Sequence, residues 1–282
     1  MTPNPIMAPK TILLRFHVMS YSAPFNIASE PTQEALVQSL LESFGSEVCI
    51  QLLKQMMLIR EFETRGEEAY FEGLVGGFYH SYAGQEAVAT AAIANLGTEQ
   101  WYYSSYRCHA LAILLNIPLE QLAGELLGKE VGCAHGRGGS MHMCGPRFPG
   151  GFGIVGGQIP LAAGTAFALK YRDEHKVSLC FIGEGAVAQG VFHETLNFSS
   201  LQSLPLMLII ENNGWGMGTA QHRALAKFPI GESQGASYNI RTFTLNGLDL
   251  FNCLLGFKEA YAYMLSSKRP VIVECLCSRF RG

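Results

Sequence analysis

The sequence contains no cysteine pair in a C-x-x-C arrangement, although eight cysteines are scattered over its 282 residues. Scattered thiols in a chain of this length are typical of reduced, mostly buried side chains rather than of a disulfide framework. No run of about 18 apolar residues occurs, so the sequence predicts no transmembrane helix. The net charge is only −3, and this small value gives no electrostatic argument for nucleic-acid binding.

The N-terminus is also poor in charge. The first 29 residues contain no acidic side chain, and their only Lys and Arg residues are Lys10 and Arg15. This composition weakly resembles an organellar transit peptide, which would place the protein in the mitochondrial matrix. We favour a simpler interpretation, in which residues 1–30 form a flexible N-terminal extension of a cytoplasmic bacterial protein.

Several segments have a clear helical or extended pattern. Apolar side chains recur at near-helical spacing between residues 46 and 72, which predicts a long helix. The alanine-rich residues 84–96 predict a tightly packed helix, and the short aromatic run 101–106 predicts a strand or extended segment. Residues 128–160 hold many glycines and little periodicity, which is typical of a functional loop. Further helices are expected at residues 30–42, 109–115, 118–127, 159–171 and 250–266.

The second half of the chain alternates apolar runs with helical segments. The runs 177–182 and 206–210 flank residues 187–201, which can form a helix, and this order predicts a β-α-β unit with parallel strands. A third apolar run at 271–274 follows another predicted helix. We therefore expect the α/β class, with a mostly parallel sheet and helices on both faces, in one domain over residues 31–282.

Polar motifs follow the two strands of the β-α-β unit. Gly183-Glu184-Gly185 follows the first strand, and Glu211-Asn212-Asn213 follows the second. Because the carboxyl ends of neighbouring parallel strands meet at one edge of a sheet, the two motifs should lie together. Carboxylate and amide oxygens suit Mg²⁺, and glycines before a helix suit a diphosphate. Either motif alone is most often a simple turn, but their joint placement predicts a metal–diphosphate site.

Further motifs support a more specific interpretation. They are Gly77-Phe-Tyr-His-Ser-Tyr-Ala-Gly-Gln-Glu86, Tyr106-Arg107, Gly136-Arg-Gly-Gly-Ser-Met-His-Met143, Gly153-Ile-Val-Gly156 and Glu211-Asn-Asn-Gly-Trp-Gly-Met-Gly218. In this order, from about residue 45 to the last residue, they resemble the alpha subunits of thiamine diphosphate-dependent pyruvate dehydrogenase components. The cofactor fingerprint of that family, Gly-Asp-Gly followed by Asn-Asn, is similar to Gly183-Glu184-Gly185 and Asn212-Asn213, which 26 residues separate.

The resemblance implies a thiamine diphosphate-binding fold, with thiamine diphosphate and Mg²⁺ as cofactors. Glu184, Asn213 and the backbone carbonyl of Trp215 would bind the metal ion, and His80 would face the reacting centre as the catalytic residue. The other implied cofactor contacts are Tyr106 and Arg107 at phosphate oxygens, Gly183, Gly185 and Ala186 around the diphosphate, Gly153 and Val155 at the aminopyrimidine ring, and Gly145 as a weaker match.

The resemblance also implies a reaction and an assembly. Pyruvate would be oxidatively decarboxylated, and the acetyl unit would pass to a lipoyl group on a partner acyltransferase. A separate beta subunit would complete the active centre in a heterotetramer of two alpha and two beta subunits. The segment Gly138-Gly-Ser-Met-His142 is similar to both pyruvate and acetoin enzymes. An acetoin dehydrogenase alpha subunit and a non-catalytic assembly subunit are therefore the alternatives.

Two departures from the family pattern affect these expectations. Glu184 stands where the family has Asp, which moves the carboxylate outward by one methylene group. Because Mg²⁺ demands near-ideal geometry, we expect weaker metal-dependent cofactor binding than with Asp. The chain ends at Gly282, where the family continues into His-Ser and a regulatory loop, so we expect that the domain is truncated at its C-terminus.

Three other sites or architectures are less well supported by the sequence. Cys133-Ala-His135 and His142-Met-Cys144 could bind zinc, but the one-residue spacing within each pair is shorter than in usual zinc motifs. Gly151-Phe-Gly153-Ile-Val-Gly156 matches the nicotinamide-binding pattern G-x-G-x-x-G, but no clear strand precedes it. A single-chain enzyme of the transketolase type would need both cofactor-binding halves, which this chain is too short to hold.

Overall fold

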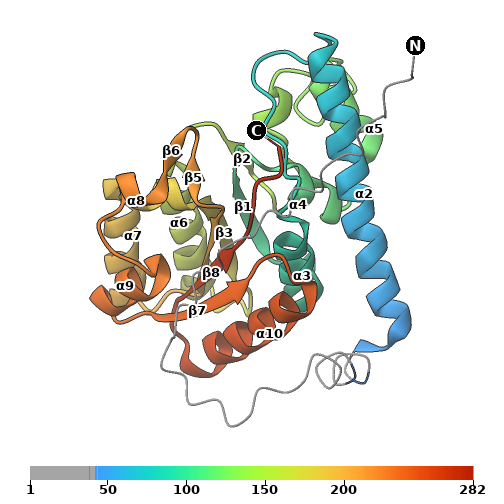
Figure 1. The fold of residues 1–282 in the computed structure, drawn as a ribbon. Coiled ribbons are helices and arrows are strands. Elements are labelled where there is room, and N and C mark those ends of the chain that lie inside the picture. The colour runs from blue at the N-terminus through green and yellow to red at the C-terminus, as the bar shows by residue number, and fades with distance from the viewer. Residues whose placement is uncertain (1–37, 39–41, 43, 282) are drawn as a thin grey trace, which may run out of the picture.

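The computed structural model describes residues 38, 42 and 44–281. The expected N-terminal extension, residues 1–30, lies outside the described residues, as does most of the helix predicted at residues 30–42. Figure 1 shows the long helix α2 (Ser46–Phe71) along one side of a central sheet. In the described part of the chain, no helix is both long enough and apolar enough to cross a membrane.

The central sheet has six strands in the order β2-β1-β3-β4-β8-β7, and every neighbouring pair is parallel. The prediction of a mostly parallel α/β sheet is therefore confirmed. The strands are β1 (Trp101–Ser105), β2 (Gly150–Phe152), β3 (Ser178–Gly183), β4 (Leu206–Asn212), β7 (Arg241–Asn246) and β8 (Val271–Leu276).

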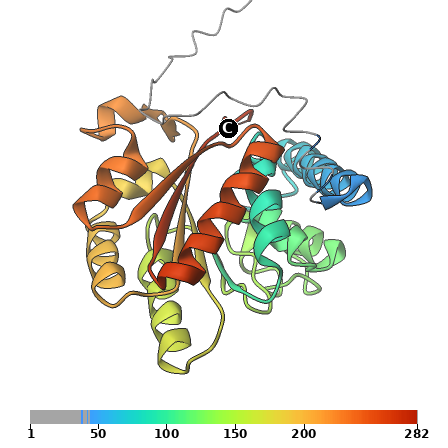
Figure 2. The same cartoon turned by 90° about the horizontal axis from the view of Figure 1, so that it is seen from below.

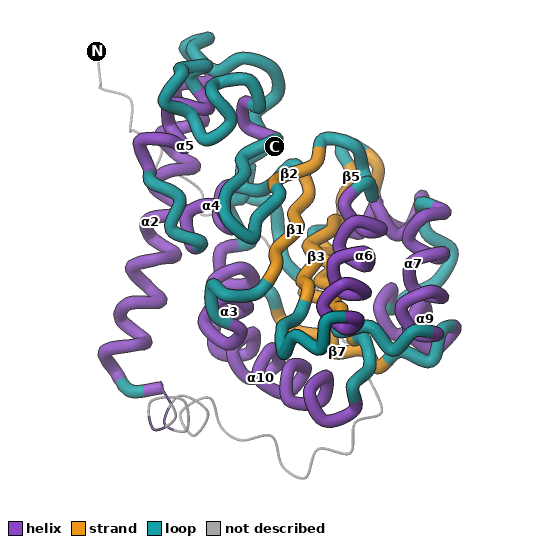
Figure 3. The backbone as a smooth tube through the Cα atoms, turned by 180° about the vertical axis from the view of Figure 1, so that it is seen from behind, coloured by secondary structure: helices purple, strands orange, loops and turns teal. Residues whose placement is uncertain are grey.

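Helices cover both faces of the sheet because alternate residues of the central strands point to opposite sides. Phe181 and Ile209 belong to one apolar core, and Ile182 and Ile210 belong to the other. Figures 2 and 3 show the helices on the two sides of the strands. The first core includes α3 (Glu86–Leu96), α4 (His109–Leu114), α5 (Leu119–Leu126) and α10 (Leu250–Ser267), and the second includes α6 (Gln158–Tyr171), α7 (Gly190–Leu201) and α9 (Ile230–Ser237).

The helix predictions inside the described range agree with these bounds to within three residues. Two strands of the central sheet were not predicted. β2 is short and glycine-rich, so it carries no apolar alternation, and β7 is an edge strand with exposed Arg241 and Asn246. The other unpredicted elements are the helix α9, the hairpin of β5 (Trp215–Gly216) and β6 (Thr219–Ala220), the helix α8 (Gln221–Ala224), and the 3₁₀ turns η1 (Gly139–Met141) and η2 (Glu184–Ala188).

The predicted β-α-β unit determines where the polar motifs meet. β3 leads through η2 and α7 into β4, and the two strands pair in register from Ser178 with Leu206 to Gly183 with Glu211. Their carboxyl ends therefore lie side by side at one edge of the sheet. The two polar motifs are brought together there, as the sequence predicts.

Candidate functional site

A cavity of about 320 Å³ opens at the carboxyl ends of β3 and β4. Its walls come from the two polar motifs, from the segment after β1, from the N-terminus of α3 and from the β5–β6 hairpin. Nine of the twelve site residues expected from the sequence line this cavity: Tyr106, Arg107, Val155, Gly183, Glu184, Gly185, Ala186, Asn213 and Trp215.

Glu184 carries a buried carboxylate at the wall of this cavity. The residue is only 2% exposed, and its Oε1 atom has no hydrogen-bond partner among the described residues. Burial raises the pKa of this carboxyl, although backbone N–H groups of Glu184 and Asn213 and the charges of Arg279 and Arg107 oppose the rise. A divalent cation at this oxygen would favour the ionised form. The residues present therefore fit a hard metal ion.

The glycines on either side of Glu184 leave open space. A Cβ atom built at Gly183 would meet nothing within 4 Å, and one at Gly185 would meet only the Gly216 Cα atom at 3.7 Å. Both residues line the cavity; Gly183 directly precedes the turn η2, and Gly185 lies in its first turn. Backbone that is free of side chains just before a helical segment is suited to the close approach of a phosphate group.

The two consecutive asparagines have different surroundings. Asn213 lines the cavity, its Nδ2 donates to Gln85 Oε1 at 3.1 Å, and its Oδ1 accepts from the Trp215 backbone N–H at 3.1 Å. Asn212 does not line the cavity, and its Nδ2 donates to Glu274 Oε1 at 2.8 Å. The motif Asn212-Asn213 therefore gives one residue to the site, whereas its first member ties β4 to β8.

Tyr106 and Arg107 also line the cavity. The buried Arg107 guanidinium donates to the Ser81 carbonyl, and its central carbon lies 5.7 Å from the centre of the Tyr106 ring. Burial lowers the pKa of Arg107, so this cation is poorly solvated. A phosphate oxygen is a suitable partner for such a group, because the planar guanidinium binds oxyanions through several N–H donors.

His80 reaches the cavity indirectly. His80 does not line the cavity itself. Its imidazole lies 4.3 Å from the ring of Tyr106, and Tyr106 does line the cavity. Burial, with help from the charges of Arg107, His109 and Arg279, lowers the pKa of His80 to about 4. The imidazole is therefore neutral at pH 7, and it can accept a proton or a hydrogen bond there.

Gly145 and Gly153 also lie outside the cavity lining. Gly145 forms an isolated bridge with Phe148, and a Cβ atom there would overlap the Ile117 side chain at 2.7 Å. The Gly153 N–H faces His142 Nε2 at 3.3 Å. The structure thus places these two expected cofactor contacts beside the cavity, and Val155 is the nearest residue of their segment that reaches it.

The polar residues of the cavity wall that were not predicted from the sequence include Gln85 and Glu211. Gln85 is 1% exposed, and its Nε2 donor has no partner among the described residues. Glu211 is buried, accepts a hydrogen bond from the Tyr82 hydroxyl, and has its pKa raised by burial to about 7. Both residues stand inside quoted motifs, but only the packing of the α3 N-terminus against the end of β4 brings them to one cavity.

The glycine-rich stretch before β2 is held by a carboxylate rather than by a metal. Glu125 accepts four backbone N–H groups, from Ala134, Gly136, Gly138 and Gly139, at 2.6–3.1 Å. In the described part of the chain, no group of three or more His, Cys, Asp or Glu residues could hold a metal ion. The alternative zinc set of Cys133, His135, His142 and Cys144 is therefore not assembled.

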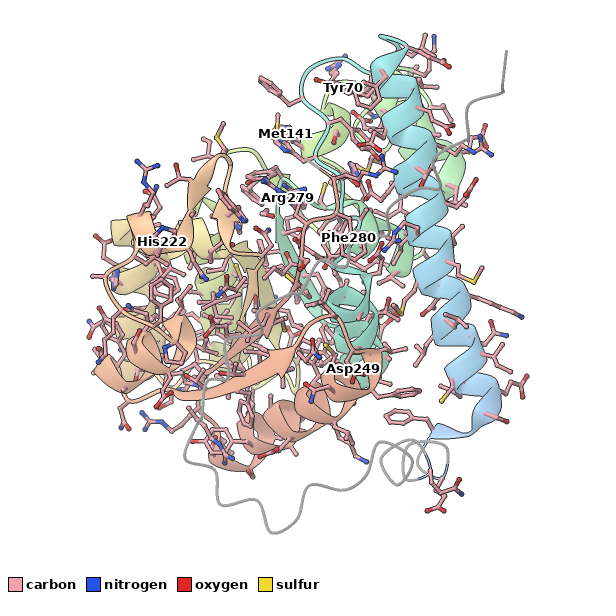
Figure 4. All side chains as sticks on the ribbon, viewed as in Figure 1. Tyr70, Met141, His222, Asp249, Arg279 and Phe280 are labelled. Carbon is pink, nitrogen blue, oxygen red and sulfur yellow. The ribbon has the colours of Figure 1, made fainter. Side chains whose placement is uncertain are left out.

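The last described segment lies near the site, where the charge of Arg279 acts on Glu184 and Arg107. Phe280 donates its backbone N–H to the Ala83 carbonyl at 3.0 Å, and Arg279 Nη2 donates to the Met217 carbonyl at 3.0 Å. Met217 lines the cavity from the β5–β6 hairpin. Figure 4 labels Arg279 and Phe280 on this segment. Residues after β8 thus join the hairpin to the segment around Ser81.

Comparison with known proteins gives consistent matches. The family model described as dehydrogenase E1 component matches residues 54–282. A pyruvate dehydrogenase E1 component subunit alpha from Rickettsia bellii is 40% identical over 238 residues, which cover 84% of this chain and 73% of the relative. The proteins of the same name from Rhizobium meliloti and Zymomonas mobilis subsp. mobilis are 36% and 38% identical, over 90% and 84% of this chain and 74% and 67% of the relatives.

Proposed function

Because this chain belongs to the dehydrogenase E1 component family, we propose that it is the alpha subunit of a thiamine diphosphate-dependent pyruvate dehydrogenase. The observation that carries the proposal is the buried, unpartnered Glu184 oxygen at the shared end of β3 and β4. Next to it lie open glycine backbone and the Arg107 guanidinium. A metal-bound diphosphate has both the cation and the oxyanions that this arrangement lacks.

The residues of the cavity have distinct parts in this proposal. Glu184, Asn213 and the Trp215 carbonyl would hold Mg²⁺. Gly183, Gly185 and Ala186 would surround the diphosphate, while Tyr106 and Arg107 would bind its oxygens. The unpartnered Gln85 Nε2 is a further donor for the diphosphate. Thiamine diphosphate supplies the carbanion stabilisation that removal of CO₂ from a 2-oxo acid requires.

His80 would act beside the reacting centre. Its imidazole is neutral at pH 7 because burial lowers its pKa to about 4, and it packs against the ring of Tyr106, which lines the cavity. A neutral imidazole can accept or donate a hydrogen bond at the substrate without adding a second positive charge to that of Arg107. Val155 and Gly153 would contact the aminopyrimidine ring from the neighbouring loop.

A beta subunit would cover the mouth of the cavity. Apolar side chains around it are exposed to an unusual degree: Ile154 is 80%, Val155 45%, Trp215 50% and Met217 78% exposed. Apolar groups gathered around a cofactor site favour a protein partner there. We therefore assign this rim to the interface of a heterotetramer of two alpha and two beta subunits. The acetyl unit would then pass to a lipoyl-bearing acyltransferase.

Cofactor binding tests the first part of the proposal. Trp215 lines the cavity, so thiamine diphosphate added with Mg²⁺ should quench its fluorescence. The Trp215→Phe variant, which keeps Trp101, serves as the control because its remaining signal should not respond. A titration with no quenching in the wild-type chain, with or without the beta subunit, would remove the proposed function.

Turnover tests the substrate. The chain would be reconstituted with its beta subunit, and pyruvate decarboxylation, acetoin cleavage and decarboxylation of branched 2-oxo acids would be followed with an artificial electron acceptor. Pyruvate should give the highest kcat/KM. A higher kcat/KM with acetoin than with pyruvate would indicate that the protein is an acetoin dehydrogenase alpha subunit. Cofactor binding without turnover of any substrate would indicate a non-catalytic assembly subunit.

A further inference from the structure

A buried chain of hydrogen bonds lies beside the cavity and takes no part in the site described above. Glu63 of α2, His109 at the start of α4 and Ser140 of η1 are 1%, 0% and 2% exposed. His109 Nδ1 lies 2.9 Å from Glu63 Oε1, and His109 Nε2 lies 2.9 Å from Ser140 Oγ. The three residues are 31 and 46 positions apart along the chain, so only tertiary packing joins them.

The donors and acceptors determine the direction of this chain. The Tyr79 hydroxyl donates to Glu63 Oε2 at 2.7 Å, and the Glu63 carboxylate also accepts the Nδ1–H of His109. In neutral His109, Nε2 is then an acceptor, and it takes the hydroxyl proton of Ser140. The Ser140 Oγ atom in turn accepts the backbone N–H of His80 at 3.4 Å. The chain therefore runs from His80 through Ser140 and His109 to Glu63.

The order Ser, His and Glu is also that of a hydrolase triad, but the surroundings exclude that function for Ser140. Ser140 and His109 are almost fully buried, and neither lines a cavity that the structure describes. A nucleophile needs room for the carbonyl carbon that it attacks. The group at the open end of the chain is instead the backbone of His80.

We propose that Glu63, His109 and Ser140 are positioning residues, which hold His80 against Tyr106 at the wall of the active-site cavity. This inference rests on the proposed function, because it requires His80 to act at the reacting centre. The chain ties three elements, α2, α4 and η1, to the segment that carries His80. Because His109 and Ser140 are almost fully buried, water does not readily replace their hydrogen bonds, and the array maintains the orientation of that segment.

A second contact strengthens the link to the glycine-rich loop. The Ser140 backbone carbonyl accepts a hydrogen bond from the Cys108 thiol at 3.4 Å. Ser140 is therefore held by both its side chain and its backbone, one residue after the segment that Glu125 organises. Loss of the Ser140 hydroxyl should release His80 while this backbone anchor stays in place.

The test follows the His80 imidazole in the full chain. Imidazole rings would be labelled with ¹³C in wild-type protein and in Ser140→Ala, and the His80 signal would be assigned by its loss in His80→Gln. His80 should titrate near pH 4 in the wild type, and its midpoint should rise by about one pH unit in Ser140→Ala as the released ring gains water. Ser178→Ala is the matched control, because Ser178 is also buried and its hydroxyl has no partner among the described residues.

The outcomes decide the proposal without reference to turnover. An equal His80 midpoint in Ser140→Ala, Ser178→Ala and the wild type would overturn it. If circular dichroism shows that Ser140→Ala is unfolded, Glu63→Gln provides the same measurement from the other end of the chain. It should raise the His80 midpoint in the same direction, and an unchanged midpoint there would equally overturn the proposal.

Turnover gives a second, separable readout. With the beta subunit, thiamine diphosphate and Mg²⁺, Ser140→Ala should lower kcat about tenfold while the cofactor Kd stays within about twofold. A merely structural role would weaken cofactor binding and kcat together, and that result would contradict the positioning role. Absence of cofactor binding in the wild type would refute the proposed function. The His80 titration would still show whether Glu63, His109 and Ser140 position His80.

Discussion

Asn212 and Asn213 are neighbours in the chain, but their side-chain amides donate in different directions, to Glu274 of β8 at 2.8 Å and to Gln85 at the start of α3 at 3.1 Å. Glu274 also accepts the Gly231 N–H at 2.8 Å. Asn212 therefore helps to satisfy a buried carboxylate in the sheet, whereas Asn213 belongs to the cavity wall. Replacing Asn213 should therefore affect mainly cofactor binding, whereas replacing Asn212 should affect mainly stability.

Asn213→Ala should weaken Mg²⁺-dependent thiamine diphosphate binding by about tenfold or more, because it removes a proposed metal ligand and its hydrogen bond to Gln85. Asn212→Ala should leave the cofactor Kd within a few-fold of wild type and lower the free energy of unfolding by about 1–3 kcal/mol, since Glu274 loses a buried donor. Fluorescence titration and urea unfolding measure the two quantities. A larger loss of cofactor affinity in Asn212→Ala than in Asn213→Ala would contradict this division.

Glu184 should control the metal dependence of cofactor binding. Glu184→Gln keeps the size of the side chain but removes its charge, so cofactor affinity in Mg²⁺ should fall by about a hundredfold. Glu184→Asp should bind more tightly than the wild type, because the shorter side chain returns the carboxylate to the position that the family uses. Glu194→Gln, at an exposed position of α7, is the control. Equal affinities of Glu184→Asp and the wild type would refute the geometric argument.

Glu125 should maintain the glycine-rich loop. Because its carboxylate accepts four backbone N–H groups, Glu125→Gln should lower the free energy of unfolding by about 2–4 kcal/mol. Amide hydrogen exchange of residues 132–140 should become faster, whereas the exposed control Glu120→Gln of α5 should change neither quantity. Exchange in this loop that is as slow as in the wild type would show that other contacts hold it.

His80 should make stability depend on pH in a defined window. Burial depresses its pKa to about 4 from an ordinary value of 6.5. Between these values the unfolded chain binds a proton that the folded chain does not, so stability is full above pH 6.5 and falls as the pH is lowered towards 4. The neutral variant His80→Gln should lack this contribution, and its unfolding midpoint should fall less between pH 7 and pH 4.5. If the unfolding midpoints of the wild type and His80→Gln fell equally between pH 7 and pH 4.5, a contribution of His80 to the pH dependence of stability would be excluded.

Much of the fold was accessible from local patterns. Apolar runs at 177–182 and 206–210, with a helical segment between them, predicted parallel strands, and the register of Gly183 with Glu211 confirms that their ends meet. Hydrophobic periodicity is a local signal, so it identifies elements whose faces are strongly apolar. It missed β7, where the exposed side chains of an edge strand weaken the apolar run, and β2, which is three residues long.

Local sequence patterns were sufficient to predict the class of fold, the edge of the sheet that carries the polar motifs, and the resemblance that the family match confirms. Tertiary structure alone decided which side chains meet there. It left Gln85 Nε2 and Glu184 Oε1 without partners at one cavity, turned Asn212 away, and joined Glu63, His109 and Ser140. These contacts depend on how distant helices pack on the sheet, and no local spacing encodes that packing.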